Sequence, residues 1–130
     1  MSEGAFARAL ALQVHAARLG FDWPDLDGVL DKMAEELREF EQARHESPSR
    51  QQEELGDLLL TAVNLARHLG LDPAATLDAA TARFAARFSG IEAALDQLPP
   101  LGSPARLRAM EVLWQNAKRQ GAAHGHDEDA

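Results

Sequence analysis

The sequence predicts an all-α protein: a bundle of about five helices that assembles as a dimer or a higher oligomer. Ala, Leu, Glu, Arg and Gln dominate the chain and β-branched residues are scarce, which favours helices over strands. Prolines also follow a capping residue three times, an arrangement typical of a helix start, at Ser47-Pro48, Asp72-Pro73 and Ser103-Pro104. No segment shows the alternation of a half-buried strand.

Glycine and proline mark where these helices should end. We expect the fourth helix to be disturbed at Ser89-Gly90 and broken by Pro99-Pro100. The expected helices span residues 3–19, 26–44, 48–70, 73–98 and 104–120. Residues 1–120 should therefore form a single domain, followed by a disordered acidic tail over residues 121–130.

The charge of the chain excludes several classes of function. Twenty-one acidic residues against 13 lysines and arginines give a net charge of −8, which argues against nucleic-acid binding. Cysteine is absent, so disulfides and thiolate metal sites are excluded. Apolar runs are short and the N-terminal segment is interrupted by charges, so we expect no membrane span and no signal peptide. A cytoplasmic protein is the expectation.

The third helix carries a narrow polar stripe among leucines. Its polar positions step by three or four residues, which places them in line on one side of the helix. A surface helix usually has a broad polar face, so the leucine-rich flanks predict burial by more than one neighbouring helix, and hence an oligomer. The stripe consists of Glu54, Asp57, Thr61, Asn64 and His68.

The second helix offers a matching acidic face. Lys32, Glu36 and Glu39 share one side of it, and a short turn to the third helix predicts antiparallel packing opposite Glu54 and Asp57. Two like charges about 4 Å apart repel by roughly 1 kcal/mol in water and roughly 4 kcal/mol at an effective dielectric constant near 20. The acids must therefore be protonated, face solvent or hold a divalent cation. An all-oxygen site favours Mg²⁺ or Mn²⁺ over Zn²⁺.

These acids form two motifs, EExxE at residues 35–39 and ExxD at residues 54–57. With this pair of motifs, the chain resembles the MazG family of nucleoside triphosphate pyrophosphohydrolases, an all-α family. The resemblance covers roughly residues 5–120 and is to the family's C-terminal catalytic domain. It extends to GFDWPDLDGVLDK (20–32), EELGDLLLTAVNLARHLGLDP (53–73), RFAARF (83–88) and LWQNAK (113–118).

The resemblance implies a function and a set of site residues. The implied reaction is hydrolysis of NTPs or dNTPs at the α–β anhydride to a monophosphate and pyrophosphate, with Mg²⁺ and with Mn²⁺ as a possible substitute. A homodimer or homotetramer is also implied. The resemblance assigns the metal to Glu36, Glu39, Glu54 and Asp57. It assigns phosphate or nucleotide contacts to Lys32, Arg50, Arg83, Arg87, Trp114 and Lys118.

Some roles stay open at this level. Glu35 and Glu53 each adjoin an expected ligand but lie about 100° round the helix, so either could be a surface charge, a partner of a ligand or the base that activates water. Thr81 and Ala86 depart from the family pattern, which usually has Asn and Arg there. These departures keep an alternative in view: a non-catalytic helical module for oligomerisation or nucleotide sensing.

Three further residues have simpler interpretations. Trp23, in the loop FDWPDLDG, is expected to pack as a loop anchor rather than to stack on a base. Asn64 and His68 are expected to be hydrogen-bonded groups at a helix interface rather than metal ligands.

Overall fold

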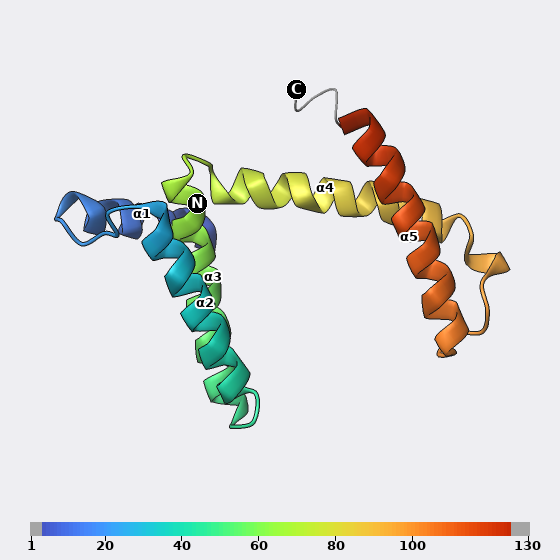
Figure 1. Ribbon diagram of the computed structural model, residues 1–130, viewed down its shortest axis with the longest axis horizontal. Coiled ribbons are helices and arrows are strands. Elements are labelled where there is room, and N and C mark those ends of the chain that lie inside the picture. The colour runs from blue at the N-terminus through green and yellow to red at the C-terminus, as the bar shows by residue number, and fades with distance from the viewer. Residues whose placement is uncertain (1–3, 126–130) are drawn as a thin grey trace. The chain divides into compact units, whose positions relative to one another are not determined.

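The computed structural model describes residues 4–125, with side chains described as far as Gly121, and these residues form five α-helices and no strand (Figure 1). The expected all-α class is confirmed. A short 3-10 helix, η1 (Leu95–Gln97), lies between the last two α-helices. The helices are α1 (Ala5–Arg18), α2 (Leu26–Ala43), α3 (Pro48–His68), α4 (Pro73–Glu92) and α5 (Pro104–Gly125). Within the described part of the chain, no helix is long and apolar enough to cross a membrane.

The capping residues start the helices as predicted. The side chains of Ser47, Asp72 and Ser103 each accept a hydrogen bond from the backbone N–H three residues later, at 3.3, 2.9 and 3.2 Å. Each bond satisfies one of the N–H groups that a helix start leaves without a partner. Gly20 and Gly70, with φ of 96° and 72°, follow α1 and α3 in the left-handed conformation that glycine adopts without strain.

The last two helices end at other places than expected. The fourth was predicted to reach Leu98, but α4 ends at Glu92. The chain tightens there: Ala94 N–H bonds to the carbonyl of Ile91, three residues back, and η1 follows before Leu98 turns extended. An extended residue is what the following proline requires. α5 in turn continues to Gly125, past the expected end near Gln120, and the expected tail after Gly125 lies outside the described residues.

The contacts divide the chain into two compact units, Met1–Leu77 and Asp78–Ala130. In the first unit, α2 and α3 pack closely along their lengths as an antiparallel hairpin, and α1 packs against α3 (Figure 1). Helices joined by so short a turn can pack only by folding back on each other. The buried apolar residues of this unit are few and small: Val29, Ala43, Val63 and Ala66.

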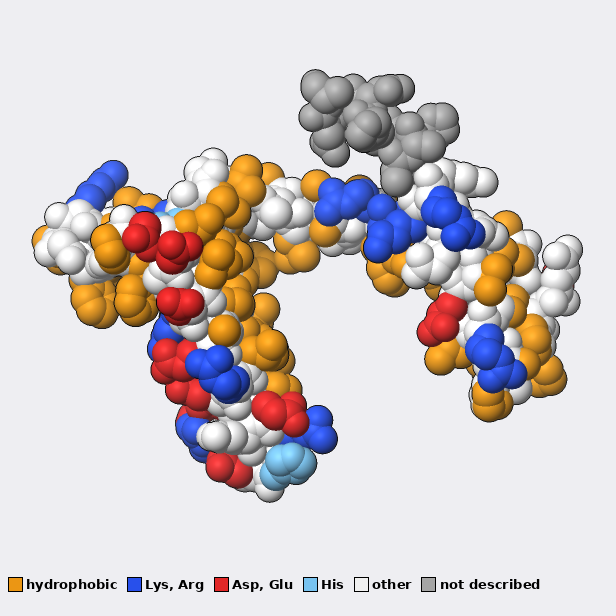
Figure 2. Space-filling view, in the orientation of Figure 1, with side chains coloured by type: hydrophobic (Ala, Val, Ile, Leu, Met, Phe, Trp, Pro, Cys, Tyr) orange, Lys and Arg blue, Asp and Glu red, His pale blue; other side chains and the backbone are white. Residues whose placement is uncertain are grey.

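The leucines that flank the polar stripe are only about half covered within the first unit. Leu55, Leu59 and Leu60 on α3 keep 47%, 50% and 47% of their surface exposed. Figure 2 shows the acidic side chains gathered on one side of the α2–α3 hairpin and hydrophobic side chains along the other. The first unit by itself therefore does not supply the burial that the sequence predicts for this face.

Candidate metal and nucleotide site

The α2–α3 hairpin brings three carboxylates together. One oxygen each of Glu36, Glu54 and Asp57 lies within 4.8 Å of the other two. Glu36 and Glu54 are buried, with 4% and 5% of their surface exposed, whereas Asp57 is exposed. We call these three residues the carboxylate cluster. Antiparallel packing opposes these positions, as the periodicity of the two helices predicts.

Each buried glutamate is held by a cation one turn earlier on its own helix. Lys32 Nζ lies 2.8 Å from Glu36 Oε1, and a terminal guanidinium nitrogen of Arg50 lies 2.7 Å from Glu54 Oε1. The second oxygen of each glutamate, Oε2, is buried and has no hydrogen-bond partner among the described residues. A buried carboxylate oxygen without a partner is costly. These two oxygens, beside a third carboxylate, fit the needs of a hard divalent cation.

Glu39 lies at the edge of the cluster rather than in it. It is not among the three residues whose oxygens meet, although the sequence groups it with them. The pKa of Glu39 is nevertheless raised, first by loss of hydration and then by the negative charges of Glu36, Glu54 and Glu35. Glu39 is therefore close enough for the negative charge of the carboxylate cluster to favour its protonated form.

Glu35 and Glu53 face outward and pair with the two cations. Glu35 is 3.6 Å from Lys32 Nζ with 49% of its side chain exposed, and Glu53 is 2.6 Å from Arg50 with 63% exposed. Arg50 also contacts Glu46 at 3.4 Å. Neither Glu35 nor Glu53 joins the carboxylate cluster. Their closest described contacts are with the two residues that hold the buried glutamates.

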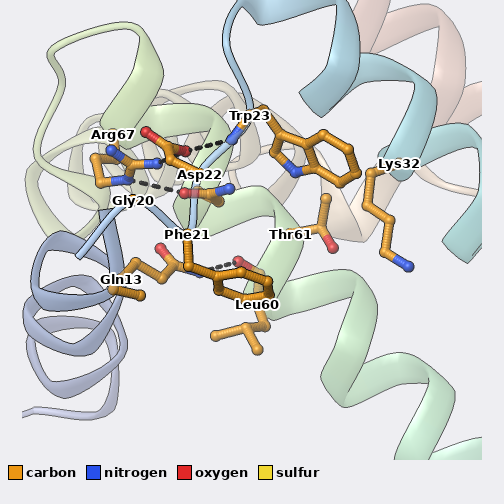
Figure 3. Close-up of a pocket in the computed structure, with 11 residues that line it drawn as sticks. Gln13, Gly20, Phe21, Asp22, Trp23, Lys32, Leu60, Thr61 and Arg67 are labelled. Atoms are coloured by element: carbon orange, nitrogen blue, oxygen red, sulfur yellow. Dashed lines mark hydrogen bonds and ion pairs between the residues drawn. The ribbon is translucent and has the colours of Figure 1, made fainter. Parts of the chain in front are cut away.

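An open cavity of about 430 Å³ adjoins the cluster and is lined by residues of α1, of the loop that follows it, and of α2 and α3 (Figure 3). We call it the α1–α3 cavity. Lys32 belongs to its wall and pairs with Glu36 of the carboxylate cluster. Thr61, also in the wall, lies one turn after Asp57 and donates a 2.9 Å hydrogen bond to its carbonyl. Figure 3 shows the Phe21 ring on the side of Leu60 and the Trp23 ring on the side of Thr61 and Lys32.

The loop is tied to the end of α3 by Asp22. This carboxylate accepts hydrogen bonds from Arg67 and from the backbone N–H of Trp23 (2.8 Å), and His68 Nε2 lies 2.9 Å from it. Arg67 Nε also donates to Asn64 Oδ1 at 2.8 Å. Both Asn64 and His68 are hydrogen-bonded, as predicted, but only the bond of His68 reaches another element, whereas that of Asn64 lies within α3. The hydrogen bond from Arg67 is the main cause that lowers the pKa of Asp22 from 3.8 to about 2.

This lowered pKa predicts an acid-sensitive step in stability. Because the folded pKa of Asp22 lies below its unfolded value, the unfolded chain takes up the proton first, so the stabilisation is lost as pH falls from about 4 to about 2. We expect Asp22→Asn to lower the free energy of unfolding at neutral pH by about 1–2 kcal/mol and to flatten its pH dependence in that range. Urea unfolding at several pH values measures this. The exposed Asp78→Asn is the control, and an unchanged pH profile for Asp22→Asn would contradict the assignment.

In the second unit, an aromatic cluster joins α4 and α5. The ring centroids of Phe84 and Trp114 are 5.0 Å apart, and Phe84 stacks on Phe88 at 5.9 Å. The Arg87 guanidinium lies 5.8 Å from the centroid of the Trp114 ring, within range of a cation–π interaction. The structure therefore brings Arg87 and Trp114 together, which the sequence places on different helices.

The other two nucleotide contacts that were expected in the second unit flank the aromatic cluster. Arg83 lies one turn before Arg87 on α4, and Lys118 one turn after Trp114 on α5, and both are exposed. Figure 2 shows basic side chains gathered over α4 and α5. This unit thus offers an aromatic surface bordered by cations, a combination suited to a nucleotide.

Comparison with known proteins decides the family. The family model described as phosphoribosyl-ATP pyrophosphohydrolase matches residues 5–84, which is more than half of the chain. The chain belongs to this family. The matched residues of this pyrophosphohydrolase family member include the whole α2–α3 hairpin and the α1–α3 cavity.

Two relatives confirm the resemblance to MazG proteins. The chain is 36% identical over 114 residues to the nucleoside triphosphate pyrophosphohydrolase/pyrophosphatase MazG of Thermotoga maritima, an alignment that covers 88% of this chain and 44% of the relative. It is 37% identical over 119 residues to the nucleoside triphosphate pyrophosphohydrolase of Escherichia coli, covering 89% of this chain and 45% of that protein. The chain therefore spans less than half the length of these relatives.

Proposed function

We propose that this protein hydrolyses nucleoside triphosphates, ribo or deoxy, at the α–β anhydride to a nucleoside monophosphate and pyrophosphate, with Mg²⁺ as cofactor and Mn²⁺ as a substitute. One observation carries the proposal: Glu36 and Glu54, each buried with one carboxylate oxygen that has no partner among the described residues, converge with Asp57 beside a cavity of about 430 Å³. The relatives named as nucleoside triphosphate pyrophosphohydrolases support it.

Glu36, Glu54 and Asp57 would hold the ion, with Glu39 at the edge of the site. Carboxylate oxygens are the protein ligands that Mg²⁺ prefers. When bound, such an ion supplies charge neutralisation for the triphosphate and acidifies a coordinated water. The exposure of Asp57 leaves one side of the cluster open to solvent and therefore to substrate.

The cations of the chain would then orient the substrate. Lys32 and Arg50 lie at the cluster itself, where they fix the buried glutamates. We assign phosphate or nucleotide contacts also to Arg83, Arg87, Trp114 and Lys118 of the second unit. The contacts of Glu35 and Glu53 support a role in positioning Lys32 and Arg50 rather than a direct one in proton transfer.

We also propose a cytoplasmic location. The half-exposed leucines of α3 support assembly as a homodimer or a homotetramer. Burying an apolar side chain is worth about 25 cal/mol per Å², so a face of several leucines stabilises association. We expect wild-type protein to sediment as a dimer or tetramer in analytical ultracentrifugation, and Leu59→Glu to shift it toward the monomer. Leu12→Glu, on the exposed face of α1, is the control. A wild-type monomer at tens of micromolar would contradict the proposal.

A product assay tests the reaction. The protein is incubated with each NTP and dNTP and Mg²⁺, and the products are resolved by anion exchange. The expected products are a monophosphate and pyrophosphate in equal amounts. Release of orthophosphate without pyrophosphate would contradict the proposal. Phosphoribosyl-ATP, which the name of the family model suggests, belongs in the same panel. If no substrate turns over, calorimetry with a non-hydrolysable nucleotide tests the non-catalytic alternative.

A further inference from the structure

We propose that the α1–α3 cavity binds the nucleoside part of the substrate, with the rings of Trp23 and Phe21 stacking on the base. The inference rests on the proposed function and adds to it where the base lies. It also revises the interpretation of Trp23 from the sequence, in which this residue only anchors the loop.

The position of the cavity is the first argument. It meets the carboxylate cluster at Lys32, whose ammonium group pairs with Glu36, and at Thr61, which bonds to the main chain of Asp57. A ligand with phosphates at the cluster can therefore extend directly into the cavity. Its volume of about 430 Å³ falls in the range of small-molecule binding sites.

The second argument is the state of the two aromatic rings. Trp23 and Phe21 keep 43% and 84% of their surface exposed, although the loop that bears them is fixed by Asp22. Gly28 allows the indole to lie against α2, because a Cβ at that position would come within 3.1 Å of the ring. One side of the Trp23 ring thus has a support, while the rest remains available. Aromatic rings held in this way are typical base-stacking surfaces.

The polar groups in the wall give the third argument. Asn64 Oδ1 accepts a hydrogen bond from Arg67, which leaves the Nδ2 amide of Asn64 to donate one to a ligand. The Thr61 hydroxyl donates its proton to a carbonyl of α3, so it can only accept a hydrogen bond from a ligand. The amide of Gln13 donates through Nε2 to another carbonyl of α3 at 2.9 Å, and its buried Oε1 has no partner among the described residues. A planar aromatic ligand with both donors and acceptors on its edge, such as a nucleobase, matches this lining.

Fluorescence gives a direct test, because the chain has two tryptophans. Wild-type protein and Trp23→Phe are each titrated to saturation with a nucleoside monophosphate and Mg²⁺, and separately with pyrophosphate and Mg²⁺, so that the difference between the two proteins isolates the response of Trp23. We expect a saturable change in Trp23 emission with the monophosphate and none with pyrophosphate. Binding of the monophosphate by calorimetry without any change in Trp23 emission would overturn the proposal. Trp23→Phe keeps an aromatic ring at this position and reports the response of Trp114 alone.

Steady-state kinetics provide an independent test. Because Trp23→Ala removes one stacking partner, we expect its KM for the NTP to rise about tenfold, with a smaller effect on kcat. Trp23→Phe, which keeps an aromatic ring, should restore most of the affinity. Leu19→Ala, an exposed residue outside the cavity wall, is the control, and circular dichroism checks folding. Pyrophosphate release with an unchanged KM in Trp23→Ala would refute the base site alone. Absence of any release by the wild type would instead refute the proposed function, and the fluorescence titration would still decide the cavity.

Discussion

Replacing Glu54 by glutamine is expected to reduce pyrophosphate release by more than about a hundredfold, since loss of a ligand should exceed the 10- to 100-fold cost of losing a group that supports one. The substitution keeps the volume of the side chain but removes the charge of a residue with 5% of its surface exposed. An amide also presents a neutral oxygen or an N–H donor where the cluster now has the unpaired Oε2. Initial rates at saturating NTP and Mg²⁺ measure the effect.

Glu41→Gln is the matched control for Glu54→Gln. It makes the same chemical change on α2, but Glu41 is exposed and pairs only with Arg44, at 3.3 Å, among the described residues. We expect this variant to retain the wild-type rate. Equal losses in the two variants would mean that overall charge, rather than the carboxylate cluster, governs activity.

Mg²⁺ is expected to stabilise the folded protein strongly. The ion would relieve repulsion among Glu36, Glu54 and Asp57, whose oxygens lie within 4.8 Å of one another, and it would give the two buried oxygens a partner. A cation that binds only the folded state adds about 2.7 kcal/mol to the free energy of unfolding when its concentration is a hundred times its Kd. Urea unfolding with and without Mg²⁺, at constant ionic strength, measures this gain.

Asp57→Asn separates this effect from general electrostatics. Asp57 is exposed, so its replacement should not weaken the packing of the protein without metal, and it removes one of three repelling charges. We expect this variant to be as stable as the wild type in chelator and to lose most of the gain with Mg²⁺. If the gain persists in Asp57→Asn, or if Na⁺ reproduces it, the cluster is not the Mg²⁺ site.

Local signals in the sequence predicted most of the fold. The starts at Ser47, Asp72 and Ser103 depend on hydrogen bonds that span three residues, so short stretches of sequence contain all that determines them. The meeting of Glu36 with Glu54 and Asp57 needs only helical periodicity and a short turn between two helices. Features that depend on one or two neighbouring turns were therefore accessible without a structure.

Features that depend on distant residues were not accessible. In the wall of the α1–α3 cavity, Asp22 pairs with Arg67, 45 residues away, and this contact ties the loop that bears Phe21 and Trp23 to α3. Nothing in the periodicity of either segment indicates that contact. The end of α4 at Glu92 was also missed, because a change from α to 3-10 hydrogen bonding over one turn leaves a weaker mark in sequence than the prolines that follow.

The pairing of Lys32 with Glu36 and of Arg50 with Glu54 has a consequence for the coordination number of a bound ion. Each glutamate has one oxygen engaged by its cation, which favours a single donor atom from each glutamate over chelation through both oxygens. With one more donor from Asp57, an octahedral Mg²⁺ would receive three of its roughly six ligands from the protein. Half of the coordination sphere would thus be left for exchangeable water and for oxygens of the arriving phosphate chain.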